Sequence, residues 1–89
     1  MFLYYMAAID EMIGHIVALK IGVAEDVDER LKQLQTGCPH ALFVLKSIEC
    51  KDKASAHRLE GRMHNRFSSD NLQGEWFEVS VELMREIFN

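Results

Sequence analysis

Proline, cysteine and long apolar runs are scarce in this sequence. One proline and two cysteines among 89 residues exclude a collagen-like chain and a disulfide scaffold, so Cys38 and Cys50 are expected to remain thiols. The longest apolar run, Phe2 to Ile9, falls well short of the roughly 18 residues that a membrane-spanning helix requires. No basic segment precedes this run, so we expect a cytoplasmic protein without a secretory signal.

Basic charge is also in the minority. Ten lysines and arginines face fourteen aspartates and glutamates, which gives a net charge of −4, and this total alone argues against a polyanionic partner. The charges are segregated, however: half of the basic residues lie between positions 51 and 67, whereas acidic residues gather at 25–29 and after 74. The chain can therefore offer one basic side to a polyanion, with weak and salt-sensitive binding.

The length suits one folded domain, residues 1–89, and 48% apolar with 27% charged residues is an ordinary globular composition. Aromatic and β-branched residues at 2–6 and 16–23 predict two strands joined by a polar turn. Asp26 as N-cap and Gly37 as terminator predict a helix over 27–36. The apolar run at 41–48 predicts a third, largely buried strand.

The second half of the chain predicts two more helices. Apolar residues recur at intervals of three and four from Lys53 to Phe67, after a capping Asp52. A polar loop over 68–73 and an extended aromatic piece follow, and Ser80 caps a final helix. The expected fold class is α+β, with a small three-stranded antiparallel sheet flanked by helices in the order β-β-α-β-α plus a C-terminal helix.

Short motifs occur along these elements in a particular order. Phe-Leu-Tyr at 2–4 opens the first strand, Lys-Ile-Gly at 20–22 lies in the second, and Arg30 lies in the first helix. Glu60 and His64 lie four residues apart on the next helix. In this order the motifs resemble the GIY-YIG nuclease superfamily, in particular a small phage and bacterial branch whose second motif is KIG. Further strings that look like this branch are Gln-Leu-Gln-Thr-Gly at 33–37 and Gly-Glu-Trp-Phe at 74–77.

The resemblance implies metal-dependent hydrolysis of phosphodiesters on one face of the sheet. Glu60 is then the ligand for Mg²⁺ or Mn²⁺, and Arg30 binds the scissile phosphate through its planar fork. Tyr4 orients or deprotonates water, and Lys20 contacts phosphate or lowers the pKa of Tyr4. His64 binds substrate, shuttles a proton or supports packing.

The sequence departs from the superfamily pattern at several positions. Lys20 stands where many members carry a tyrosine, Phe2 replaces a glycine, and Leu34 stands where many members carry histidine or tyrosine. The segment between Tyr4 and Lys20 is longer than usual, which predicts an enlarged hairpin loop near the site. If the register were shifted by one residue, Tyr5 would take the place of Tyr4.

Simpler roles exist for the same residues. Arg30 can pair with Asp26 on a solvated helix face, and Glu60 can balance a basic neighbour on its own helix. Gly61, inside a helix, suggests a close approach to the sheet. Trp76 can close the core over the sheet edge, or offer a stacking platform to a base.

Arg58, Arg62 and Arg66 recur every four residues and are predicted to contact a nucleic-acid backbone. The leading hypothesis is a metal-dependent endonuclease that acts on nucleic acid, DNA rather than RNA, with specificity supplied by loops, a homodimer or a separate partner. One alternative is a nucleic-acid-binding module that is weakly active or inactive. The other is a regulatory protein-interaction domain that uses the acidic surface.

Overall fold

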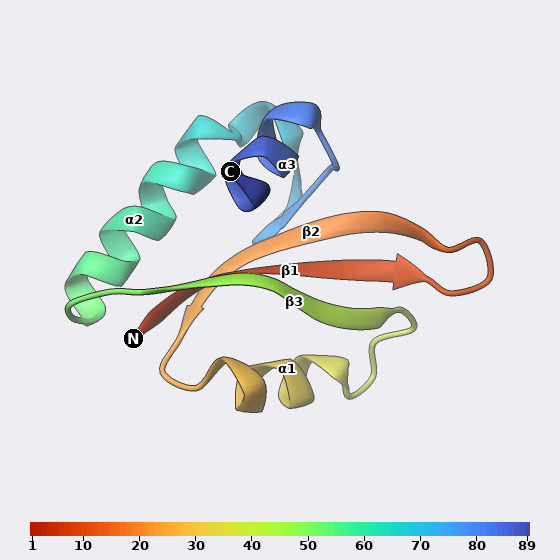
Figure 1. Ribbon diagram of the computed structural model, residues 1–89, viewed down its shortest axis with the longest axis horizontal. Coiled ribbons are helices and arrows are strands. Elements are labelled where there is room, and N and C mark those ends of the chain that lie inside the picture. Colours follow the sequence, from red (N-terminus) through yellow and green to blue (C-terminus); the bar gives the residue numbers. More distant parts are fainter.

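The computed structural model describes all 89 residues and has a five-stranded antiparallel sheet at its centre (Figure 1). Strands β1 (Phe2–Asp10) and β2 (His15–Ala24) form a hairpin, and β3 (Ala41–Glu49) pairs with the other edge of β1. Two short strands, β4 (Asn71–Gln73) and β5 (Trp76–Phe77), extend the sheet beyond β2, so the strand order is β3-β1-β2-β5-β4. The predicted α+β class is confirmed.

The predicted number of three strands is wrong, because the aromatic segment near the C-terminus joins the sheet. Trp76 of β5 lies opposite Lys20 of β2. Asn71 of β4 fastens the turn between the two short strands, since its side-chain amide donates to the carbonyl oxygens of Gly74 at 2.9 Å and Trp76 at 3.2 Å. The predicted polar loop over 68–73 is thus a 3₁₀ turn (Ser68–Asp70) followed by β4.

The hairpin of β1 and β2 has longer strands than predicted and a short turn. The strands extend to Asp10 and from His15, so that only residues 11–14 form the turn, where Gly14 has a left-handed φ of 70°. Tyr4 pairs with Gly22 far from this turn. The predicted enlarged loop near the site is therefore wrong, because the additional residues lengthen the strands instead.

Each of the three helices begins at its predicted cap. Helices α1 (Val27–Gln35), α2 (Lys53–Arg66) and α3 (Val81–Phe88) have Asp26, Asp52 and Ser80 as N-caps. Each cap side chain accepts a hydrogen bond from the backbone N–H three residues later, at 3.0, 2.7 and 3.1 Å respectively. Gly37, with a φ of 80°, follows the end of α1 as predicted. No helix has the length and apolar character needed to cross a bilayer.

The sheet separates two layers of helices (Figure 1). Helices α2 and α3 pack on one face, and α1 packs on the other. Because side chains alternate along a strand, Tyr5 faces the core under α2 and α3, whereas Tyr4 faces α1. Both tyrosines are buried, as are Met6 and Ala8 on the α1 face. The main core consists of Leu3, Tyr5, Ala7, Leu19, Ile21, Phe67, Phe77, Leu83 and Ile87.

Candidate active site

Gly22 creates the space that the Tyr4 side chain occupies on the α1 face of the sheet. The two residues lie opposite each other in the hairpin. A β-carbon on Gly22 would overlap the Tyr4 hydroxyl and would approach Oε1 of Glu75 to 3.0 Å. The phenol and this carboxylate therefore surround the same point of the β2 backbone, a juxtaposition that only glycine permits.

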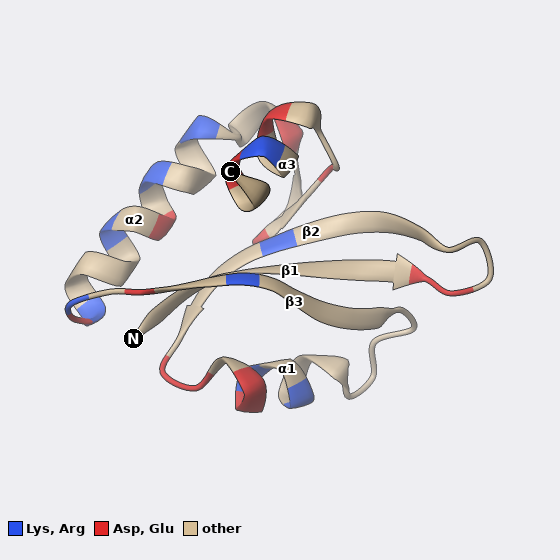
Figure 2. Ribbon diagram, in the orientation of Figure 1, with Lys and Arg blue, Asp and Glu red and all other residues tan.

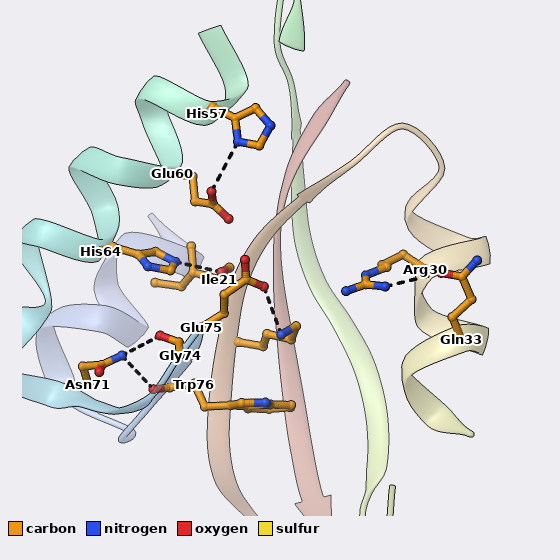
Figure 3. A network of polar contacts seen from close by, with 11 residues as sticks. Ile21, Arg30, Gln33, His57, Glu60, His64, Asn71, Gly74, Glu75 and Trp76 are labelled. Carbon is orange, nitrogen blue, oxygen red and sulfur yellow. Dashed lines mark hydrogen bonds and ion pairs between the residues drawn. The ribbon is translucent and has the colours of Figure 1, made fainter. Parts of the chain in front are cut away.

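Arg30 reaches from α1 toward the same face of the sheet (Figure 3). Its guanidinium lies close enough to the Tyr4 hydroxyl to favour the phenolate, and its Nη1 donates to Oε1 of Gln33 at 3.4 Å. It forms no ion pair with Asp26, the simpler role considered for it. The structure thus brings Arg30 to Tyr4, as the resemblance implies.

The Tyr4 hydroxyl is nevertheless held in its neutral form. Burial raises the pKa of Tyr4 above its ordinary value, and the carboxylates of Glu75 and Glu60 raise it further, against the opposing effect of Arg30. Lys20 does not lower this pKa, because its ammonium pairs with Glu75. Tyr4 has no exposed surface. In this arrangement the neutral phenol lies beside the Arg30 guanidinium, a group that only donates hydrogen bonds, and it is not poised to deprotonate water.

Lys20 and Glu75 form an ion pair that sequence reasoning did not predict. The Lys20 Nζ lies 3.0 Å from Glu75 Oε1 and 5.2 Å from the centre of the Trp76 ring. Only 8% of the Lys20 side chain is exposed, compared with 38% for Glu75. Lys20 is therefore covered by its partners, and it is the carboxylate of Glu75 that faces outward.

Glu60 extends from α2 toward Glu75, so that two carboxyl groups meet at the β2 edge (Figure 3). Burial raises the pKa of Glu60, and the adjoining Glu75 carboxylate raises it further. Burial also acts on Glu75, but Lys20 and the shared contact with Glu60 outweigh it and lower the pKa of Glu75. Glu75 is therefore the ionised member of the pair, and Glu60 is the member that holds a proton more readily.

Two histidines flank Glu60 on α2. His57 Nδ1 lies 3.6 Å from Glu60 Oε1, although half of the His57 side chain is exposed. The Nε2 of His64 lies 2.9 Å from the carbonyl oxygen of Ile21, and its ring meets the Phe77 ring edge-on, with the ring centres 5.0 Å apart. A carbonyl oxygen only accepts, so Nε2 of His64 carries a proton. Only Nδ1 of His64 then remains to accept one.

The Glu60 carboxylate has one buried oxygen, Oε2, that makes no hydrogen bond. Such an atom is unfavourable unless a cation or a proton satisfies it. Two adjacent carboxylates suit Mg²⁺, which binds through one or two carboxylates and keeps several waters and substrate phosphates as its other ligands. No group of three or more histidine, cysteine, aspartate or glutamate side chains is arranged to hold a metal ion by itself.

Basic residues recur along α2 (Figure 2), and the three predicted nucleic-acid-binding arginines among them have different surroundings. Arg58 donates to Ser55 Oγ at 3.1 Å and stays exposed. Arg62 is exposed and makes no ion pair or side-chain hydrogen bond. Arg66 pairs with Glu86 of α3 and lies over the Phe67 ring. The outward basic charge of α2 therefore comes mainly from Arg58, Arg62 and the exposed Lys53 at its first position.

The site consists of Arg30 on the α1 side, the carboxyl groups of Glu60 and Glu75 with His64 at the other end, and the buried Tyr4 and Lys20 between them. Of these, Glu75 was not predicted as a site residue, because it was counted only among the acidic residues after position 74. The signal that could have found it is the string Gly-Glu-Trp-Phe at 74–77, since pairing of Trp76 with β2 brings Glu75 to Lys20.

Comparison with known proteins identifies a family but no individual relative. The model of the T5orf172 domain matches residues 2–89, nearly the whole chain. No curated protein and no solved structure matches it. This domain is compatible with a nuclease-like or DNA-binding module. The chain belongs to the T5orf172 domain family.

Proposed function

We propose that this domain is a metal-dependent endonuclease that hydrolyses phosphodiester bonds, with DNA as the preferred substrate. The observation that carries the proposal is the buried, unpaired Oε2 of Glu60 beside the ionised carboxylate of Glu75. Two such groups are stable together when a cation or a proton joins them. The resemblance to GIY-YIG nucleases and the T5orf172 match both agree with this activity.

Glu60, with Glu75 beside it, would hold Mg²⁺ or Mn²⁺. When bound, the metal ion neutralises charge on the phosphate and stabilises the leaving oxygen. The Lys20 Nζ lies 3.0 Å from Glu75 Oε1, and this ion pair keeps the Glu75 carboxylate ionised and oriented. Lys20 is therefore a positioning residue, and its contact with substrate phosphate would require Glu75 to release it.

The remaining residues bind the phosphate and handle protons. Arg30 is only partly buried, and its guanidinium can hold two phosphate oxygens at once. The hydroxyl of the buried Tyr4 lies beside that guanidinium and helps to position it. His64 is fixed by the Ile21 carbonyl, which leaves its Nδ1 available to accept a proton from water. The exposed Arg58 and Arg62 of α2 would contact the flanking nucleic-acid backbone.

Cleavage assays with defined substrates test the proposal. The purified domain is mixed with plasmid, single-stranded DNA and RNA, each with Mn²⁺, with Mg²⁺ and with excess EDTA. Cleavage that requires the metal and is strongest on a DNA substrate is the expected result. Absence of cleavage of every substrate with either metal would overturn the proposal.

A non-catalytic nucleic-acid-binding module is the second candidate, and the exposed Arg58 and Arg62 favour it independently of Glu60. Its signature is DNA affinity that falls steeply with salt, without cleavage. Absence of DNA binding at low salt would exclude both nucleic-acid functions. It would instead favour a protein-interaction domain that uses the acidic surface.

A further inference from the structure

A pocket that the proposed mechanism does not use lies beside the candidate site. Its volume is about 480 Å³, within the size range of small-ligand sites. Ala8 and Ala18 line it from β1 and β2, where they lie opposite each other. Trp76 lines it from β5, and Cys38 and His40 line it from the loop after α1.

Two of the residues that line the pocket, Ala18 and Trp76, lie next to the candidate active site. Ala18 and Lys20 are two residues apart in β2 and therefore point to the same face of the sheet. Trp76, opposite Lys20, has its ring 5.2 Å from the Lys20 ammonium, which in turn contacts Glu75. A strand whose phosphate lay at Arg30 and Glu75 would thus have this pocket next to it.

The lining of the pocket has the chemistry of a nucleobase site. Trp76 offers an aromatic face, and the two alanines leave room for a flat ring. The His40 imidazole and the Gln73 side-chain amide supply polar groups for the edge of a base. An apolar peptide side chain would leave both of these polar groups without a partner.

We infer that this pocket binds one unpaired nucleobase, stacked on Trp76, next to the phosphate at the active site. The inference rests on the proposed function and specifies its substrate. A base inside a duplex is stacked on its neighbours and cannot enter, so the preferred substrate is single-stranded or locally unpaired. A larger side chain in place of Ala8 or Ala18 would then fill the space that the base occupies.

Trp76 is the only tryptophan in the chain, so its fluorescence reports directly on this pocket. Binding is measured in EDTA with a short single-stranded DNA, an abasic strand of equal length and a blunt duplex. The intact strand is expected to quench Trp76 fluorescence and to bind about tenfold more tightly than the abasic strand, the effect of one stacked base. Equal quenching and equal affinity for the intact and abasic strands would overturn the inference.

A substitution that fills the pocket distinguishes binding of the base from binding of the phosphate. Ala18→Leu is expected to remove the preference for the intact strand and to leave the weak affinity for the abasic strand. Val81→Leu, which adds apolar bulk at an exposed position on α3, is the control and should keep the preference. A preference that persists in a folded Ala18→Leu variant would place the base elsewhere and contradict the inference.

The two cysteines provide a second readout. Cys38 lines the pocket, whereas Cys50 follows β3 and contacts the Ile48 carbonyl. The intact strand should slow alkylation of Cys38 and leave Cys50 unchanged, with both sites followed by mass spectrometry. Lack of Cys38 protection, together with metal-dependent cleavage, would refute the base pocket and leave the proposed nuclease intact. Lack of any binding or cleavage would refute both.

Discussion

The Tyr4 hydroxyl lies against the Cα of Gly22, in the volume that any other side chain at position 22 would fill. This contact joins the first and second motifs across the hairpin. The same volume also borders Glu75 Oε1, which the pairing of β5 with β2 and the ion pair with Lys20 bring to this point. The glycine of the second motif is therefore a steric requirement of the site.

Gly22→Ala is expected to impair both folding and activity. The new methyl group must displace the Tyr4 ring and the Glu75 carboxylate, and overpacking of this kind lowers the free energy of unfolding by about 1–3 kcal/mol. Urea unfolding measures the stability, and cleavage at a temperature where the variant is folded measures the activity. An unchanged midpoint and rate would contradict the assigned contact.

Gly61→Ala is the matched control for that experiment. The sequence suggested that Gly61 marks a close approach to the sheet, but this expectation is wrong, because a β-carbon there meets nothing within 4 Å. Gly61 lies inside α2 next to Glu60, and alanine is the better helix former. The substitution should raise stability by about 0.5–1 kcal/mol and leave cleavage intact.

Lys20 and Glu75 should be energetically coupled. Lys20→Met removes the ammonium and leaves Glu75 facing Glu60 without a counter-charge, which should lower stability by about 1 kcal/mol, since Glu75 is partly solvated. Adding Glu75→Gln to this variant should recover part of the loss. Urea unfolding of the two single variants and the double variant measures the coupling, and strict additivity would show that the pair contributes nothing.

Arg62 and Arg66 should differ in their contribution to DNA binding. Arg62 is free, so Arg62→Ala should lower the slope of log affinity against log salt by about one. Arg66 is paired with Glu86, so Arg66→Ala should change the slope less and lower stability by about 0.2–1 kcal/mol. Fluorescence titrations over a salt series test this. Equal slope changes for the two variants would count against the ion pair.

Tyr5 should make the domain sensitive to alkali. Burial raises the pKa of Tyr5 to about 12, with an added effect of Glu86 and an opposing one of Arg66, whereas the unfolded chain ionises near the ordinary value of 10.0. The stabilisation is complete below pH 10 and is lost as the pH rises toward 12, at up to about 1.4 kcal/mol per pH unit. Tyr5→Phe should flatten this decline in unfolding measurements. The same decline in both proteins would contradict the burial of this hydroxyl.

Local signals in the sequence were sufficient for much of the fold. The caps Asp26, Asp52 and Ser80 each accept a hydrogen bond from a backbone N–H only three residues later. The neighbouring sequence is therefore enough to predict where each helix begins. Because side chains alternate along β1, Tyr4 and Tyr5 point to opposite faces of the sheet, and the register shows which face each one takes. The three helices and three long strands follow from such short-range patterns.

The interactions that the sequence did not reveal are long-range. A two-residue strand such as β5 has no periodicity to detect, so its pairing with β2, and with it the place of Glu75, required the structure. The acidic C-terminal region likewise looked almost uncompensated, yet Lys20 pairs with Glu75 and Arg66 with Glu86. The burial of Tyr4 and Lys20 also depends on how distant elements cover them.

The most direct test of the account is DNA cleavage by Glu60→Gln in the presence of Mn²⁺. The substitution keeps the size of the side chain and removes the charge that would hold the metal, and Glu78→Gln, at an exposed glutamate outside the site, is the matched control. With circular dichroism showing both variants folded, cleavage should fall at least a hundredfold for Glu60→Gln, a typical loss for an essential charge-stabilising group, and stay unchanged for Glu78→Gln. Cleavage by Glu60→Gln at the parent rate would contradict the central claim that Glu60 holds the catalytic metal.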